Sequence, residues 1–303
     1  MLPSADPEHH APARARRAAI VATLAAAVLF GVGTPAAKQL LAGFDPALLA
    51  GLLYLGMGGA LALVFVARGA PPPRFDRTEA AWLSLSVVLG GAVAPWLLFW
   101  GLARTPATVA SLLLNTEVVL TALIARFLFR ERYGRRLFAG LGLIALGSAV
   151  LGGGARAPAE LVPTLAVLGA CLAWAIDNNA TKRIAHADAS FIGLAKGLIA
   201  GSCNTLLALG AGASWPAAGA IAAAFSIGAV SYGASFGLYM RGMRELGAAR
   251  TSALFASAPF AGAALAVGFL GEPVTARLLV AAVAMAVGVW IHVIERHGHG
   301  SPG

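Results

Sequence analysis

The chain has 303 residues, of which 59% are hydrophobic and only 12% are charged, and its formal net charge is +9. Soluble domains carry about 25% charged residues, so this composition, with a mean hydropathy of +0.79, excludes an ordinary soluble domain. The two cysteines, Cys171 and Cys203, lie in apolar segments and form neither a metal-binding spacing nor a disulfide framework.

Stretches without charge recur along the chain at the length that a bilayer requires. A helix of about 20 residues, rising about 1.5 Å per residue, crosses a hydrocarbon core about 30 Å thick. Helices are expected because lipid offers no partners to open backbone groups, and the runs lack barrel-type alternation. The longest uncharged run, residues 197–240, exceeds one crossing and folds back at "GAGASWP" (210–216). The sequence predicts ten transmembrane helices, at 18–41, 46–67, 80–103, 106–129, 137–155, 161–183, 190–210, 217–241, 249–270 and 274–293.

Lysine and arginine residues favour one orientation of these spans. With the amino terminus inside, sixteen basic residues fall on cytoplasmic segments and four fall outside, which fits the positive-inside rule. Residues 1–17 are expected to be a disordered cytoplasmic terminus, and 295–303 a cytoplasmic tail. The first apolar run exceeds the 7–15 residues of a signal-peptide core, so we expect the first span to be retained. The bias accounts for the positive charge, which argues against nucleic-acid binding.

Two segments of the chain match two later segments, each without gaps. "GLARTPATVASLLLNTEVVLTALIARFLFRE" (101–131) aligns with "GMRELGAARTSALFASAPFAGAALAVGFLGE" (242–272) at an offset of 141, which brings Glu131 onto Glu272. "FGVGTPAAK" (30–38) aligns with "WAIDNNATK" (174–182) at an offset of 144, which brings Lys38 onto Lys182. The chain therefore divides into two repeats of five spans each.

An odd number of spans per repeat has a topological consequence. The first repeat (18–155) and the second (161–294) enter the membrane from opposite sides, which is the inverted-repeat architecture of many secondary transporters. Such folds place a binding site near the midplane between interrupted helices. Helix breaks are expected at "GVGTP" (31–35) and at the polar triplet 177–179, and kinks at Pro95 and Pro259.

The chain resembles the EamA-type transporters of the drug/metabolite transporter superfamily. The resemblance is carried by the two five-span halves and by "FGVGTPAAK", "LARTPATVASLL" (102–113) and "LGEPVT" (270–275). It implies a basket of spans one to four and six to nine around a central cavity, with spans five and ten at the periphery. In span two, Tyr54 stands where many relatives carry an arginine, so the resemblance does not extend anion recognition to this chain.

Ionisable residues inside the spans are candidates for function, because each costs about 2.5–3.5 kcal/mol at a helix centre. Asp177 lies six residues before Arg183, and Lys196 lies six after Ser190 on the returning helix. Both are therefore about 9 Å from the cytoplasmic boundary, and we expect them to form an ion pair. The pair is either purely structural or part of a cytoplasmic gate or substrate contact.

Neighbouring polar and aromatic residues extend this candidate site. Asn178 and the adjacent Asn179 point in different directions on the helix, so one can bond between helices while the other contacts substrate. Trp174, one turn deeper, either lines the cavity or packs. The candidate substrate-binding or coupling residues are Glu117, Asn115, Asp177, Asn178, Lys196, Asn204, Trp174 and Tyr232.

Glu117 is the leading functional candidate. It lies eleven residues after Pro106 and thirteen before Arg130, near the bilayer midplane, and no basic residue is expected at that depth. Asn204 and Asn115 are expected to reach a similar level, as is the segment 226–231. Burial disfavours the ionised form of a carboxyl group without a partner charge. Glu117 is thus expected to exchange a proton or bind a cationic group, and the alternative is a protonated side chain bonded between helices.

These features predict a secondary transporter that exports or exchanges a small metabolite, such as an amino acid, across the bacterial inner membrane, with possible proton coupling. The alternative is a multidrug or metal-cation exporter of the same fold. A membrane-embedded enzyme that uses Glu117 or Asp177 as a catalytic carboxylate is less favoured, because the sequence shows no paired carboxylates near a nucleophile and carries the inverted repeat. No cofactor or metal site is expected, since His9, His10, His297 and His299 lack acidic partners, and the chain has no Walker loop. The expected partners are the bilayer, a small-molecule substrate and protons.

Overall fold

The computed structural model describes residues 13–69, 71–128, 130, 134–153 and 158–298, and within these residues the secondary structure is helical. The all-α prediction is therefore confirmed for the described chain. The helices of the first half are α1 (Ala13–Leu40), α2 (Pro46–Ala67), α3 (Arg77–Ser86), η1 (Val87–Val93), α4 (Ala94–Leu102), α5 (Ala107–Leu113), α6 (Thr116–Leu128) and α7 (Arg135–Gly152). Those of the second half are α8 (Pro158–Lys182), α9 (Ala189–Ala195), η2 (Lys196–Ala200), α10 (Gly201–Gly210), α11 (Ala218–Ile227), η3 (Gly228–Ala234), α12 (Ser235–Leu246), α13 (Ala248–Phe255), α14 (Ala258–Leu270) and α15 (Ala276–Gly298).

Several of these elements join end to end into membrane-length helices. Among the described residues, eight helices are long and apolar enough to cross a bilayer, and two shorter apolar helices, 138–152 and 276–291, lie within α7 and α15. These ten coincide with the ten predicted segments within a few residues. Residues 1–12 of the expected disordered terminus and 299–303 of the tail lie outside the described residues. Helix α1 already begins at Ala13.

The helix boundaries repeat at the spacing found in the sequence. The π-helical segments η1 and η3 begin at Val87 and Gly228, an offset of 141, and both are seven residues long. A second irregularity also recurs, because α5 ends at Leu113 and α13 ends at Phe255, each followed by two residues before the next helix. The two halves therefore share local backbone geometry where their sequences have diverged.

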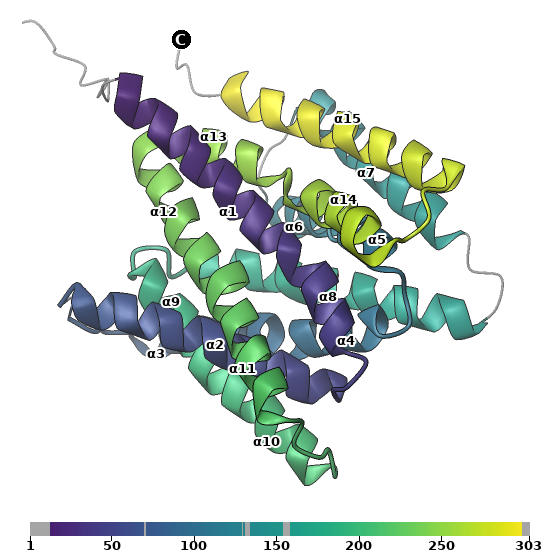
Figure 1. Cartoon of the computed structure of the whole chain (residues 1–303). Coiled ribbons are helices and arrows are strands. Elements are labelled where there is room, and N and C mark those ends of the chain that lie inside the picture. The colour runs from purple at the N-terminus through teal and green to yellow at the C-terminus, as the bar shows by residue number, and fades with distance from the viewer. Residues whose placement is uncertain (1–12, 70, 129, 131–133, 154–157, 299–303) are drawn as a thin grey trace, which may run out of the picture.

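Helices α7 and α15 pack along each other at one edge of the bundle (Figure 1). A Cβ at Gly147 would meet Ala281 and Met285, and a Cβ at Gly288 would meet Gly140 and Ile144. At an offset of 141, Gly147, Gly140 and Ile144 become Gly288, Ala281 and Met285. The contacts are thus reciprocal, as in a two-fold interface, and the pairing runs antiparallel.

The prediction of helix breaks at "GVGTP" and at the polar triplet 177–179 is wrong. Helix α1 runs through "GVGTP" with Pro35 inside it, and α8 runs through Asp177, Asn178 and Asn179. A proline removes one backbone bond, which a packed transmembrane helix tolerates. Asp177 and Asn178 leave α8 intact because their side chains bond to neighbouring helices.

The two prolines that were expected to kink helices lie where one helical segment ends and the next begins. Pro95 stands in the first turn of α4, directly after η1. Pro259 stands in the first turn of α14, directly after the break that follows α13. Proline is favoured in a first helical turn, where its missing N–H leaves no bond unmade.

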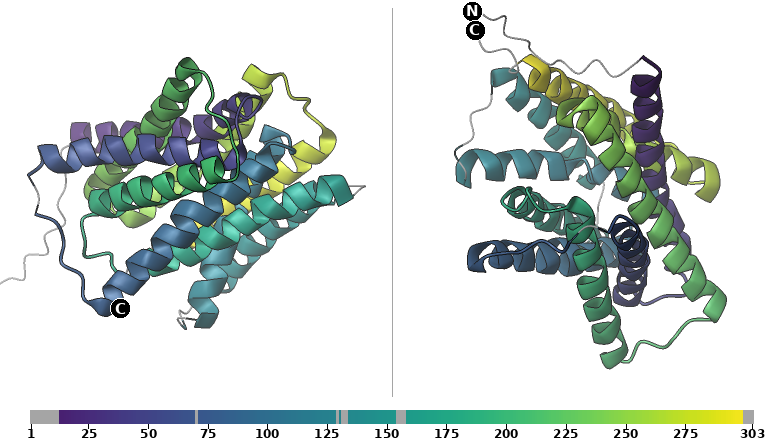
Figure 2. Two further views of the ribbon diagram at one scale, coloured as in Figure 1. Left: turned by 90° about the horizontal axis from the view of Figure 1, so that it is seen from below. Right: turned by 90° about the vertical axis from the view of Figure 1, so that its left-hand side faces the viewer.

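The start of α1 and the end of α15 lie toward the same end of the molecule, and the connection between α10 and α11 lies at the other end (Figures 1 and 2). The large buried core gathers Leu, Ala, Val and Phe side chains from both halves, including Leu48, Phe99, Leu113 and Met285. A second, small buried cluster of Ile184, Ala187 and Ile192 packs against Phe75 and Trp82 beside the connection between α8 and α9.

Candidate functional site

Asp177 of α8 and Lys196 of η2 form the ion pair that the sequence predicts. Lys196 Nζ lies 2.7 Å and 2.8 Å from the two carboxylate oxygens of Asp177. The side chain of Lys196 is 16% exposed and that of Asp177 is 6% exposed. Ser86 Oγ and Thr181 Oγ1 also donate to Asp177 Oδ1, and Lys196 donates to Thr181 Oγ1 at 3.3 Å. A buried pair persists only when such additional bonds satisfy both charges.

The carboxylate of Asp177 presses against the backbone of η1. A Cβ at Gly90 would overlap its carboxyl group, so only glycine allows this approach. The sequence analysis did not identify Gly90 or Ser86 as part of the site. Ser86 carried a weak signal, as a hydroxyl within an apolar run, whereas the role of Gly90 depends on helix packing.

The wide turn of η1 offers its carbonyl oxygens to side chains of other helices. The Gly90 carbonyl accepts hydrogen bonds from Tyr54 Oη at 3.1 Å and from Trp174 Nε1 at 3.0 Å. The Ala92 carbonyl accepts one from Asn204 Nδ2 at 3.1 Å. π-Helical segments are frequent at functional sites. Here η1 connects α2, α8 and α10 through these three bonds.

Glu117 of α6 faces α8. Asn178 Nδ2 donates to Glu117 Oε1 at 2.7 Å and lies 3.4 Å from Thr121 Oγ1. Asn179 Nδ2 bonds the Thr121 carbonyl at 3.2 Å, so both asparagines connect α8 to α6. Glu117 is half-buried, and Asn178 is exposed.

The hydrogen-bond partner of Glu117 is Asn178, the residue after Asp177 in α8, and the sequence analysis did not predict this contact. Counting residues for depth assumes straight helices parallel to the membrane normal. The helix carrying Glu117 is broken at Leu114 and Asn115, which shifts its register relative to α8.

Three candidates form no side-chain hydrogen bond with Glu117 among the described residues, and their own partners lie elsewhere. Asn115 is buried and bonds the Leu112 carbonyl at 3.1 Å, within the break between α5 and α6. Asn204 is bonded to η1. Tyr232 of η3 packs against Phe30 and Tyr54, with ring centroids 5.7 Å and 6.1 Å apart.

The polar cluster combines residues of both halves and has no charged counterparts at the repeat-related positions compared next. At the offsets of 144 and 141, Asp177 corresponds to Gly33, Asn178 to Thr34 and Glu117 to Ala258. The fold is therefore repeated in the two halves, whereas Glu117 of the first half and Asp177 of the second each lack a charged counterpart in the other half. A fold-stabilising role would not require this difference, which marks the cluster as a candidate for function.

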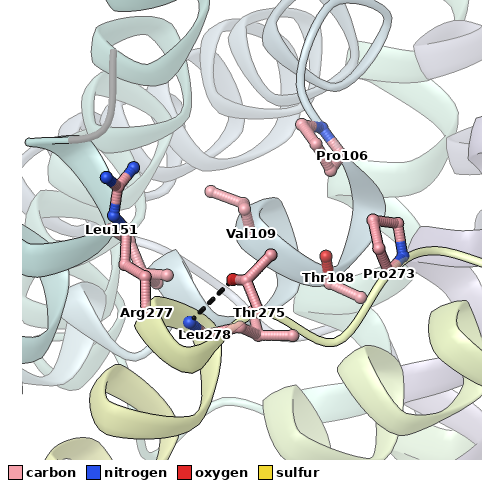
Figure 3. Close-up of a pocket in the computed structure, with 8 residues that line it drawn as sticks. All are labelled: Pro106, Thr108, Val109, Leu151, Pro273, Thr275, Arg277 and Leu278. Atoms are coloured by element: carbon pink, nitrogen blue, oxygen red, sulfur yellow. Dashed lines mark hydrogen bonds between the residues drawn. The ribbon is translucent and has the colours of Figure 1, made fainter.

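A separate cavity of roughly 200 Å³ lies away from this cluster (Figure 3). It opens between the start of α5, with Pro106 and Thr108, and the segment from Pro273 to the first turn of α15. The Thr275 hydroxyl caps α15 by accepting a bond from Leu278 N at 3.1 Å.

The family profile described as "EamA-like transporter family" matches residues 17–153 and again residues 162–294. The chain belongs to the EamA-like transporter family. This confirms the resemblance seen in the sequence, and with the eight membrane-length helices it makes the chain a multi-pass membrane transporter.

Named relatives agree with this membership. The chain is 28% identical over 293 residues to an "Uncharacterized transporter" of Methanothermobacter thermautotrophicus, covering 89% of this chain and 84% of that protein. Two shorter matches are to proteins named "Probable 4-amino-4-deoxy-L-arabinose-phosphoundecaprenol flippase subunit ArnE". That of Sodalis glossinidius is 39% identical over 77 residues, and that of Pseudomonas paraeruginosa 43% over 76. Each covers 25% of this chain, and 68% and 64% of the respective relative.

A solved structure titled only "Crystal structure of protein" has a TM-score of 0.69 to this one, with 20% sequence identity. The alignment covers 94% of this chain and 99% of that one. At this identity the match shows the fold alone.

Proposed function

We propose that the chain is a secondary active transporter that exports or exchanges a small metabolite carrying an amino group, such as an amino acid, with Glu117 as its substrate-binding or coupling carboxylate. One observation carries the proposal. Glu117 Oε1 accepts from Asn178, whereas Oε2 has no hydrogen bond to any residue that the structure describes, and the side chain is half-buried. A carboxylate with an open oxygen in mid-span is available for a ligand.

The charges of the cluster favour a cationic ligand. Asp177 and Lys196 neutralise each other in a bidentate pair. Ionised Glu117 therefore adds one uncompensated negative charge, which a proton or a single ammonium group can neutralise. Charged side chains in spans face a cavity or each other because exposure to hydrocarbon is costly. We infer that Glu117 and Asn178 line the transport path.

Competition at one carboxylate supplies a coupling mechanism. If an ammonium group and a proton bind Glu117 alternately, each occupied form neutralises the site and can change its access from one side to the other. Net flux of substrate in one direction then requires proton flux in the other. The direction of transport is set by the substrate gradient and the proton gradient.

We further propose the ten-span, inverted topology with both termini in the cytoplasm of the bacterial inner membrane, and the domain boundaries 18–155 and 161–294. Support comes from the offset of 141 shared by sequence and helix boundaries, and from the antiparallel pairing of α7 and α15. The distribution of Lys and Arg favours the orientation.

The name of the shorter relatives supports an amino group as the recognised feature, because their named lipid-linked sugar is a 4-amino compound. The Asn178 amide adds a second contact, since its carbonyl oxygen can accept from the same ammonium group. In this proposal Asn204 and Trp174 maintain the geometry of η1 through their bonds to its carbonyls. Asn115 does the same for the break between α5 and α6.

Glu117→Gln tests the proposal in proteoliposomes loaded with a metabolite panel. Gln keeps the shape and can still bond Asn178, but it cannot release a proton. We expect normal expression and folding, a loss of proton-driven transport of tenfold or more, and no remaining pH dependence. Glu245→Gln, the same change at an exposed position of α12, is the matched control and should transport normally.

A Glu117→Gln variant that transports at the wild-type rate with an unchanged pH profile would contradict the role of Glu117. Transport by neither protein for any member of the panel, under either gradient, would contradict the transporter proposal itself.

A further inference from the structure

Five aromatic side chains form a continuous row beside the polar cluster: Tyr54, Tyr232, Phe30, Phe255 and Tyr239. Successive ring centroids are 6.1, 5.7, 5.4 and 5.0 Å apart along this aromatic row. Its members come from α2, η3, α1, α13 and α12, so the row depends on tertiary packing of both halves. All except Tyr54 are partly exposed.

One end of the aromatic row meets the polar cluster. Tyr54 Oη shares the Gly90 carbonyl with Trp174 Nε1, and Trp174 lies one helical turn from Asn178. The next member, Tyr232, has no hydrogen bond from its hydroxyl to any described residue. Gly33 allows the Tyr232 ring to approach α1, because a Cβ there would lie 3.2 Å from its hydroxyl oxygen.

We propose that the aromatic row binds the apolar body of the substrate, so that the transported class is monovalent amines with an apolar or aromatic group. This inference rests on the proposed function. Glu117 supplies the negative charge, and the ring faces attract both cations and apolar surface. Because the row continues from Tyr232 to Tyr239, it can contact an apolar substrate group larger than a methyl group.

The test compares methylamine with phenethylamine, which share a charge and differ in their apolar body. In wild-type proteoliposomes we expect phenethylamine to have the lower KM. Tyr232→Ala should raise the KM for phenethylamine by about threefold or more, the effect of losing one cation–π or stacking contact, and leave that for methylamine unchanged. Phe65→Ala removes one ring of an aromatic pair elsewhere, with Phe191 at 5.5 Å, and should change neither.

Equal KM changes for the two amines in Tyr232→Ala, or no change for either, would overturn the aromatic-row proposal. If the wild type moves other metabolites but neither amine, the amine class fails while the transporter proposal stands. If nothing is moved, the proposed function fails.

The corner between α4 and α5, residues 103–106, provides a second and independent inference. Lys38 Nζ of α1 donates to the carbonyls of Leu102 at 2.6 Å, Thr105 at 3.0 Å and Ala103 at 3.2 Å. The Glu272 carboxylate accepts from the backbone N–H groups of Ala107 and Thr108, both at 2.7 Å. A cation thus caps the end of α4 and an anion the start of α5, as helix polarity favours.

The two bonds of Glu272 connect the halves of the protein. Glu272 follows α14 in the second half, where Gly271 adopts a left-handed conformation that turns the chain toward α5. The cavity shown in Figure 3 lies beside this contact and is lined by Pro106, Thr108 and Pro273. The corner is therefore attached to the second half by polar bonds next to open space.

We propose that Glu272 is a latch that holds the α4–α5 corner against the second half and closes this end of the molecule, and that its release opens that end during transport. The latch rests on the proposed function, in whose topology this end faces outside. Its repeat counterpart, Glu131, lies outside the described residues.

Cross-linking tests whether the corner must separate. Glu272→Cys and Thr108→Cys are combined in a protein with Cys171→Ala and Cys203→Ala, and joined by a reducible bis-methanethiosulfonate. We expect transport to fall tenfold or more on cross-linking and to recover with dithiothreitol. Recovery shows that the protein remained folded. Undiminished transport by the cross-linked protein would overturn the latch.

Glu272→Gln tests whether the charge keeps this end closed. A reporter, Ser111→Cys, is placed in α5, where Ser111 is 1% exposed and its Oγ has no hydrogen-bond partner among the described residues. We expect Glu272→Gln to speed labelling from outside by an impermeant maleimide at least threefold. Asp45→Asn, which changes a carboxylate that caps α2, is the matched control and should leave labelling unchanged. If Glu272→Gln leaves the labelling rate of Ser111→Cys unchanged, with or without a lower melting temperature, the latch proposal is wrong and Glu272 acts only as a helix cap.

Discussion

At the scale of single residues, the ion pair of Asp177 and Lys196 joins α8 to η2 at the candidate site. Asp177 and Lys196 could be matched because each lies six residues from the same membrane boundary, and insertion cost demands a partner. Ser86 and Gly90 could not be predicted, since their contacts depend on how η1 is rotated against α8. The Glu117–Asn178 contact was missed for a different reason. The break between α5 and α6 changes the register of the helix, and counting residues ignores that change.

The ion pair leads to a double-mutant prediction. Lys196→Ala leaves Asp177 with only hydroxyl partners, Ser86 and Thr181, and should cost about 3–5 kcal/mol, as when one partner of a buried pair is removed. The double change with Asp177→Asn should restore much of this stability, since Asn can still accept from Ser86. Thermal unfolding in detergent measures the cycle. Losses that simply add in the double variant would mean that the two side chains are not energetically coupled.

At the scale of helices, charge-free lengths predicted the ten apolar helices within a few residues, because bilayer thickness sets the length of an uncharged run. The irregularities were harder to predict. Polar residues in α8 indicated a break, but their bonds go to α6 and α3 instead of to solvent. The π-helical segments carry no clear signal in the sequence, and the carbonyls of η1 are bonded by side chains that tertiary structure brings together.

Helix pairing gives a prediction for α7 and α15. In Gly288→Ala, the new Cβ would lie 2.5 Å from the Gly140 carbonyl oxygen and 2.8 Å from Ile144, so we expect destabilisation by about 1–3 kcal/mol. Gly59→Ala in α2 is the matched control, because its Cβ would meet nothing within 4 Å, and the added helix propensity should leave it neutral or slightly stabilised. Unfolding temperatures in detergent measure both. Equal behaviour of the two variants would contradict close packing of α7 on α15.

At the scale of the whole molecule, the repeat was visible in the sequence because a few positions kept their spacing of 141, and the same spacing appears in η1 and η3. Family membership follows from both halves together. The substrate does not follow from the fold, because the residues that would recognise it are those in which the halves differ. Glu117, Asp177 and Asn178 have no polar or charged equivalents beyond Thr34, so their function has to be tested directly.

Topology is the last prediction, and it determines which end the Glu272 latch would close. The excess of Lys and Arg predicts that the connection between α2 and α3 lies in the cytoplasm and the connection between α10 and α11 outside. Thr78 and Ser214 are exposed in or beside these connections, so each can be replaced by cysteine in a protein with Cys203→Ser.

In intact cells, an impermeant maleimide should label Ser214→Cys and leave Thr78→Cys unmodified, and inverted membrane vesicles should give the reverse. The protein without introduced cysteines is the control, since its remaining Cys171 is buried. The opposite labelling pattern would invert the orientation, and the Glu272 latch would then close the cytoplasmic end. Labelling of both positions from one side would be incompatible with an odd number of spans between them, and so with the inverted repeat itself.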